Sequence, residues 1–136
     1  MIVLVTGGRE YGNRDSAQQS EKERVQLIDA LQDVHIRTPI TCVVHGYANG
    51  ADAIANAWAL NRKIKVMGFR ADWRKSGRAA GPERNARMVQ WCAQHADSLG
   101  VIVLAAPGGR GTADCVRKAQ AAGLRVIQLP DIEGAP

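Results

Sequence analysis

Aromatic residues are scarce in this 136-residue chain, because Phe, Trp and Tyr together make up only 4% of it. A surface that stacks single-stranded nucleic acid needs exposed aromatic rings, so this scarcity counts against such a surface. The chain also has only three cysteines, Cys42, Cys92 and Cys115, which are widely spaced and form no Cys-x-x-Cys pair. This argues against a disulfide framework and a zinc site. We interpret Cys42 as a core residue and expect Cys115 to pack a helix rather than serve as a catalytic thiol.

Long apolar runs and several familiar catalytic motifs are absent as well. No apolar run approaches the roughly 20 residues that cross a membrane, and the apolar residues 1–5 have no basic region before them. We therefore expect a first strand rather than a signal peptide, a cytoplasmic location and no membrane partner. The sequence lacks a P-loop, a Gly-x-Gly-x-x-Gly fingerprint after its first strand, a His-Glu-x-x-His pair and a Gly-x-Ser-x-Gly elbow. We expect no metal and no cofactor.

Positive charge is what the chain has in excess. Eighteen Lys and Arg residues stand against thirteen Asp and Glu residues, which gives a formal net charge of +5. Many of the arginines fall in or near predicted loops. The planar guanidinium fork suits phosphate oxygens. The charge pattern therefore favours an anionic ligand, either a nucleotide or a nucleic acid.

Strand-like and helix-like segments alternate along the chain. Apolar, β-branched runs predict strands over residues 2–5, 40–44, 64–68, 101–104 and 124–129. Between the strands, helical spacing predicts four helices. The first has Ser20 as its N-cap and Glu23 as its capping-box partner, and the second begins at residue 53. The third has Pro82 as its first residue, and the fourth begins at residue 113. Residues 69–82 form a long, irregular basic connection. The alternation predicts an α/β fold, a single Rossmann-like domain over residues 1–136. We expect a parallel sheet of about five strands with helices on both faces, and a tail over residues 130–136.

A glycine-rich stretch between the fourth predicted strand and the last predicted helix organises these elements. A strand that leads through glycines into a helix builds an anion pocket, because the backbone N–H groups can approach a phosphate closely. We predict that this loop binds the phosphate of a nucleotide-like ligand. Its residues are Pro107, Gly108, Gly109, Arg110, Gly111 and Thr112.

Two further strand ends carry glycines. These junctions comprise Thr6, Gly7, Gly8 and Arg9 after the first strand, and His45 and Gly46 after the second. Because the carboxyl ends of parallel strands meet at one edge of a sheet, we expect all three junctions to face one crevice. His45 either donates to a phosphate or makes structural hydrogen bonds. Asp52, in the first turn of the next helix, either stabilises that helix terminus or bonds to a ligand hydroxyl or a neighbouring loop.

These junctions, together with Asp72-Trp73 and with Gly81-Pro82-Glu83-Arg84-Asn85 and Met88, resemble the SLOG superfamily. This is the Rossmann-like group around the LOG-type phosphoribohydrolases and the DNA-processing protein DprA. The set is most similar to its YspA/YpsA-related branch. LOG enzymes hydrolyse the N-glycosidic bond of nucleoside 5′-monophosphates, and their Pro-Gly-Gly-x-Gly-Thr loop binds the phosphate. The resemblance implies that Arg84 completes the site. It also places Asp114 and Cys115 where LOG enzymes carry two acidic residues.

Glycosidic cleavage would assign catalytic roles to Asp114, Arg84 and Glu83. Breaking the N-glycosidic bond builds oxocarbenium character on the sugar. A carboxylate can stabilise that charge, or it can activate a water molecule that attacks the sugar. Asp114 is the first candidate for that carboxylate, with Asp52 or Glu83 as second choices, and Arg84 would clamp phosphate or orient the carboxylate. The alternative role of Asp114 is to stabilise the helix N-terminus. Cys115 in place of the second acid weakens the enzymatic interpretation.

Three functions follow from these observations, in order of preference. The first is a domain that senses or sequesters a nucleotide or a nucleotide-derived small molecule. The second is a nucleoside 5′-monophosphate N-glycosidase. The third is DNA binding of the DprA sort, which the basic charge and the arginines of residues 70–78 suggest. Related proteins commonly form dimers, and the apolar helix faces allow a homodimer.

Overall fold

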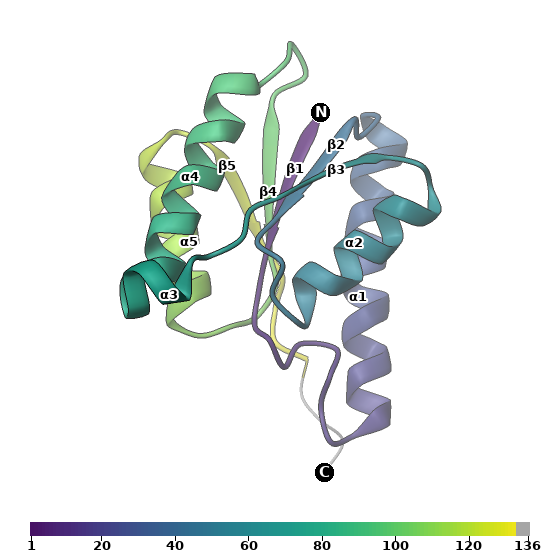
Figure 1. Cartoon of the computed structure of the whole chain (residues 1–136). Helices are drawn as coiled ribbons and strands as arrows, with labels where there is room; N and C mark the ends of the chain where they lie inside the picture. Colours follow the sequence, from purple (N-terminus) through teal and green to yellow (C-terminus); the bar gives the residue numbers. More distant parts are fainter. Residues whose placement is uncertain (133–136) are drawn as a thin grey trace.

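Five short parallel strands form one sheet in the computed structural model, which describes residues 1–132 (Figure 1). In chain order the strands are β1 (Ile2–Thr6), β2 (Cys42–His45), β3 (Lys65–Gly68), β4 (Val101–Ala105) and β5 (Arg125–Gln128). Their order across the sheet is β3-β2-β1-β4-β5, and every neighbouring pair is parallel. The chain reverses its direction of winding between β1 and β4. In open α/β sheets, ligands bind beyond the carboxyl ends of the strands at such a reversal.

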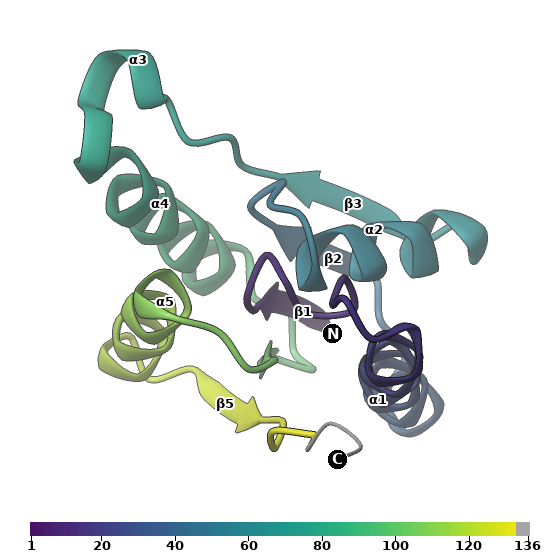
Figure 2. The same ribbon diagram turned by 90° about the horizontal axis from the view of Figure 1, so that it is seen from below.

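Helices cover both faces of the sheet, as Figure 2 shows. One face carries α1 (Ala17–Arg37) and α2 (Ala51–Asn61), and the other carries α4 (Ala80–His95) and α5 (Arg110–Ala121). Two short elements, α3 (Trp73–Ser76) and the 3-10 turn η1 (Gly77–Ala79), join β3 to α4. The predicted Rossmann-like α/β fold is confirmed. None of the helices in residues 1–132 is long and apolar enough to cross a lipid bilayer.

The two helical layers pack on alternate residues of the same strands. In β1, Val3 and Val5 point into the core beneath α1 and α2, whereas Ile2 and Leu4 point into the core beneath α4 and α5. Because a central parallel strand is buried on both faces, its sequence is a continuous apolar run rather than an alternating one. That run at the start of the chain is why β1 could be predicted. The buried sheet holds the ends of β1 and β4 next to each other.

The predicted start of the first helix was wrong. The N-cap of α1 is Ser16, whose Oγ accepts a hydrogen bond from the Gln19 N–H at 3.1 Å. Ser20 lies inside the helix, and its Oγ accepts from the Arg14 N–H at 2.7 Å. Glu23 is buried and pairs with Arg14, with Nε and Oε1 3.0 Å apart, instead of reaching back to the Ser20 N–H. Ser20 and Glu23, which match a capping box in sequence, therefore anchor the loop before α1 through Arg14.

The start of α4 also differs from the prediction. The helix begins at Ala80, so Pro82 is its third residue and not its first. This position suits proline because the first four N–H groups of a helix have no intrahelical partner. The connection predicted to be irregular carries α3 and η1 instead. Of the predicted tail, residues 130–132 form neither helix nor strand, and residues 133–136 lie outside the described residues.

Candidate functional site

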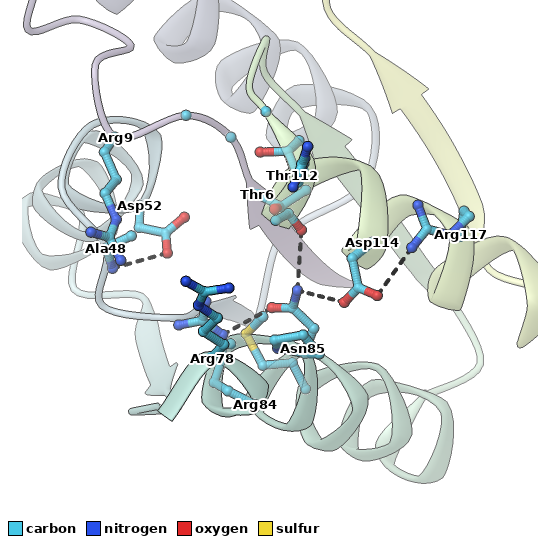
Figure 3. A pocket seen from close by; sticks show the side chains of 18 of the residues that line it. Thr6, Arg9, Ala48, Asp52, Arg78, Arg84, Asn85, Thr112, Asp114 and Arg117 are labelled. Atoms are coloured by element: carbon cyan, nitrogen blue, oxygen red, sulfur yellow. Dashed lines mark hydrogen bonds and ion pairs between the residues drawn. The ribbon is translucent and has the colours of Figure 1, made fainter. Parts of the chain in front are cut away.

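A pocket of about 590 Å³ lies at the carboxyl ends of β1 and β4, where the winding of the sheet reverses (Figure 3). Its volume is in the range usual for small-molecule sites. The residues that line it come from the end of β1, from the loops after β1, β2 and β4, from α3 and η1, and from α2, α4 and α5. They include eleven of the predicted site residues, namely Thr6, Gly7, Gly8, Arg9, Asp52, Arg84, Gly109, Arg110, Gly111, Thr112 and Asp114.

The glycines of the site divide into two groups. Gly8 lets the loops after β1 and β4 pack together: its N–H donates to the Pro107 carbonyl at 2.9 Å, and a Cβ on Gly8 would lie 3.0 Å from that oxygen. A Cβ on Gly108 would collide with the Thr112 hydroxyl. Within residues 1–132, a Cβ on Gly109 or Gly111 would meet no atom of another part of the chain within 4 Å, and both residues line the pocket. The backbone of Gly109 and Gly111 is therefore open to a ligand.

The N-terminus of α5 opens onto this pocket. Its N-cap is Gly109, no side chain caps the terminus, and the first turn contains no acidic residue. The first N–H groups of a helix have no intrahelical partner and carry partial positive charge. An anion placed there would accept hydrogen bonds from these free N–H groups.

Arginine side chains surround the same space. Five arginines line the pocket against two aspartates, and one of the five, Arg117, pairs with Asp114 at 3.2 Å. The other four form no ion pair with any carboxylate in residues 1–132. These four are Arg9, Arg78, Arg84 and Arg110. The pocket thus has an excess of positive charge, which favours an anionic ligand.

Arg84 is the most constrained of these arginines. It extends from α4, and its Nη1 donates to the Gly46 carbonyl at 2.6 Å while its Nε donates to Asn85 Oδ1 at 2.9 Å. A Cβ on Gly46 would collide with the guanidinium, so this glycine makes room for Arg84. Burial lowers the pKa of Arg84, and the nearby Asp52 carboxylate offsets part of that shift. An arginine remains charged regardless, so a partly desolvated cation stands in the pocket wall.

Asp52 holds the loop after β2. Its Oδ2 accepts hydrogen bonds from the N–H groups of Gly46 at 2.9 Å and Ala48 at 3.2 Å. The residue is 5% exposed, and burial raises the pKa of its carboxyl, although the two backbone hydrogen bonds offset part of that rise. No group in residues 1–132 donates to Oδ1. One oxygen thus organises the loop, and the second leaves a hydrogen-bond acceptor in the pocket wall.

Asp114 is fully engaged with its neighbours. Lys118 Nζ lies 2.9 and 2.7 Å from its two oxygens, and Asn85 Nδ2 donates to Oδ2 at 3.0 Å. Asn85 also donates to the Gly111 carbonyl at 3.1 Å, which ties α4 to the glycine loop (Figure 3). Burial tends to raise the pKa of Asp114, but these hydrogen bonds outweigh it, so the pKa lies below its usual value. The carboxylate joins α4 and α5 and has few free lone pairs.

Five predicted site residues lie outside the pocket wall. His45 is buried, its Nε2 lies 2.9 Å from Asn56 Oδ1, and its Nδ1 accepts from the Tyr47 N–H at 3.0 Å. The structure therefore gives His45 two structural hydrogen bonds. Gly46 contacts the site through its hydrogen bonds with Arg84 and Asp52, and Pro107 and Gly108 line two adjoining hollows. Glu83 is exposed on α4.

Some residues of the pocket wall are not among the predicted site residues. Trp73, Asn85 and Met88 belong to the motifs of the family resemblance, and Arg78 belongs to a basic segment. No sequence pattern indicates that Arg117 is a site residue, because an arginine one turn beyond Ala113 is ordinary on a helix surface. Proximity in the fold, rather than sequence spacing, identifies these residues.

The three cysteines are free and buried. Burial raises the pKa of the Cys115 thiol to about 11 and that of Cys92 to about 12, and it also raises the pKa of Cys42. A neutral, buried thiol is a poor nucleophile. No group of three or more His, Cys, Asp or Glu residues in the part of the chain described here could hold a metal ion.

This burial predicts slow thiol chemistry. At neutral pH we expect dithionitrobenzoate to react with no cysteine of the folded protein on the timescale of minutes, and with all three in urea. The released thionitrobenzoate absorbance measures both rates. Rapid reaction of Cys115 alone in the folded protein would contradict its assignment as a packing residue.

Comparisons with known proteins show the family of the chain. A model of the YspA, cpYpsA-related SLOG family matches residues 1–75, which include the loops after β1 and β2. The chain is also similar to the Gene 61 protein of Mycobacterium phage D29, at 40% identity over 139 residues that cover 95% of this chain and 96% of the relative. The predicted resemblance is therefore confirmed. The chain belongs to the YspA, cpYpsA-related SLOG family, and this membership supports, at a coarse level, a nucleotide-related binding domain.

Proposed function

We propose that the protein binds a nucleotide or nucleotide derivative in this pocket, with a phosphate against the N-terminus of α5. The observation that carries this proposal is the convergence of four arginines without carboxylate partners on an uncapped helix terminus. Arg84 among them is half-buried, and a partly desolvated cation without an ionic partner is costly. A ligand phosphate would supply the missing negative charge and would accept hydrogen bonds from both the arginines and the backbone.

The rest of the pocket suits the sugar of such a ligand. Asp52 Oδ1 is an acceptor in the pocket wall, and a ribose hydroxyl is a donor of matching geometry. The pocket therefore offers two kinds of group: open backbone at Gly109 and Gly111, which suits a phosphate, and a carboxylate oxygen at Asp52, which suits a hydroxyl. A molecule that combines a phosphate with hydroxyls satisfies both.

A thermal-shift screen tests the proposal. At millimolar concentration, we expect at least one of AMP, GMP, CMP, UMP and ADP-ribose to raise the melting temperature by several degrees, because a ligand specific to the native state stabilises it. Arg110→Gln should reduce that shift. Arg125→Gln removes the same charge from an exposed position on β5, outside the pocket, and should leave the shift unchanged. If none of these ligands raises the melting temperature, the proposal is wrong.

Nucleotide N-glycosidase activity is a second candidate, and the free Asp52 Oδ1 favours it. A carboxylate beside the bound sugar would stabilise an oxocarbenium-like transition state or accept a proton from the attacking water. Asp114 suits this role less well, because Lys118 and Asn85 occupy its oxygens. Chromatography of incubations with the four monophosphates would reveal free base and ribose 5-phosphate. Release that Asp52→Asn abolishes would establish the activity, and no release by the wild type would exclude it for these substrates.

A further inference from the structure

The six aromatic side chains are distributed unevenly over the fold. Tyr11 and Trp58 are buried in the core, and Phe69 packs against Trp91 with ring centroids 6.2 Å apart. Only Tyr47, at 48% exposure, and Trp73, at 51%, present a large part of their rings to solvent. In a chain with so few aromatics, a half-exposed tryptophan in a pocket wall is unexpected for packing alone.

Trp73 is held at the pocket by its neighbours. It is the first residue of α3, whose N-cap is Asp72, with Oδ1 accepting from the Lys75 N–H at 3.1 Å. The ring lies over Gly81, where an added Cβ would stand 3.4 Å from the indole Cη2. No residue of α3 or η1 is buried, so small changes in the tilt of the ring would not disturb the core.

The exposed face of this ring meets only a weak partner. The Arg9 guanidinium, from the loop after β1, lies 5.8 Å from the ring centroid, near the outer limit of a cation–π contact. Tyr47 differs, because Arg70 lies 4.2 Å above its ring and His45 packs edge-on at 4.8 Å. Tyr47 is also not part of the pocket wall. Of the two exposed rings, only Trp73 offers a face to a ligand in the pocket.

We propose that Trp73 stacks against the base of the bound nucleotide, so that the ligand class is a nucleotide carrying a planar base and not a simple sugar phosphate. This inference rests on the proposed function. Every nucleobase has a π-face, so a single indole recognises a base without reading its hydrogen-bonding edge. Arg9 then shifts from the ring toward the phosphate, for which its charge is better suited.

Calorimetric titration with ribose 5-phosphate and with AMP, GMP, CMP and UMP tests the inference. We expect the wild type to bind the best monophosphate about 5- to 100-fold more tightly than ribose 5-phosphate, as is typical of one stacked base. Trp73→Ala should remove most of that difference and leave ribose 5-phosphate affinity unchanged, and Trp73→Phe should restore most of it. Tyr47→Ala, a matched change at the other half-exposed ring, should have no effect. Circular dichroism would verify that each variant is folded.

The outcomes separate the two proposals. If Trp73→Ala binds the monophosphates as the wild type does, or if the wild type binds ribose 5-phosphate equally well, base stacking is wrong although the phosphate site stands. If Trp73→Ala weakens binding of a single-stranded oligonucleotide but of no monophosphate, the ring belongs to a nucleic-acid surface and this inference is also wrong. If none of the monophosphates, ribose 5-phosphate and ADP-ribose binds the wild type, the proposed function fails together with it.

Discussion

Replacing Arg84 with methionine should weaken nucleotide binding by about 10- to 100-fold, because a charge-assisted hydrogen bond contributes roughly 1.5–3 kcal/mol. Methionine preserves most of the apolar stem that packs in the wall and removes only the guanidinium. Among the pocket arginines, Arg84 is the one fixed at both Nε and Nη1, by Asn85 and by the Gly46 carbonyl. Such fixed donors lose little conformational entropy when a phosphate binds.

The same substitution should barely affect the free protein. Arg84 lies where burial lowers its pKa and forms no ion pair with a carboxylate in residues 1–132, so its charge is a cost to folding. Removing that cost offsets the lost bonds to Gly46 and Asn85, and we expect the free energy of unfolding to change by less than about 1 kcal/mol. Urea unfolding measures the stability and calorimetry measures the affinity. A variant that loses several kcal/mol of stability while keeping its affinity would show that Arg84 is structural.

Gly50→Ala should cost about 4 kcal/mol of folding free energy, combining backbone strain of roughly 1–3 kcal/mol with overpacking of similar size. Gly50 is the N-cap of α2 and has φ +78° and ψ −125°, a conformation that alanine rarely adopts. A Cβ there would strike the backbone oxygens of Gly8 and Arg9, and backbone cannot move aside as a flexible side chain can. The loss would be a large fraction of a typical domain's stability.

Gly77→Ala provides a matched control for this prediction. Gly77 has nearly the same backbone conformation, with φ +55° and ψ −128°, but nothing lies within 4 Å of the position its Cβ would take. Its substitution should therefore cost only the strain, and the difference between the two variants in urea unfolding isolates the contact with the β1 loop. Equal losses for both variants would mean that this close packing contributes nothing to stability.

The sheet and its binding edge could be predicted because they depend on local patterns. The apolar run of β1 and the glycines around residues 7–8 and 108–111 have the same meaning in any parallel α/β protein. The predicted α1 start failed for a non-local reason: Glu23 bonds to Arg14 and to the Gly12 N–H rather than to Ser20. Side-chain competition of this kind depends on how the loop folds back, which no short motif records.

The candidate site was only partly accessible to sequence reasoning for a similar reason. His45 follows a strand, as a ligand-binding residue would, yet its ring turns to Asn56 and away from the pocket. Asp114 matched an acidic position of the related hydrolases, but Asn85 of α4 also occupies one of its oxygens, and this contact depends on how α4 packs against α5. Trp73 reaches the pocket from a connection that was expected to be irregular. Its position in the pocket wall depends on α3, which the sequence pattern does not predict.

An NMR titration of the ¹⁵N-labelled protein with the nucleotide that gives the largest thermal shift tests the central claim most directly. If a phosphate binds at the N-terminus of α5, the backbone amides of Gly109, Arg110 and Gly111 should show the largest shifts, because they would donate to it. Amides at the opposite end of the sheet, such as that of Gly100, should not move. Saturable shifts that avoid the α5 terminus, or no shifts at any nucleotide concentration, would contradict a phosphate site in this pocket.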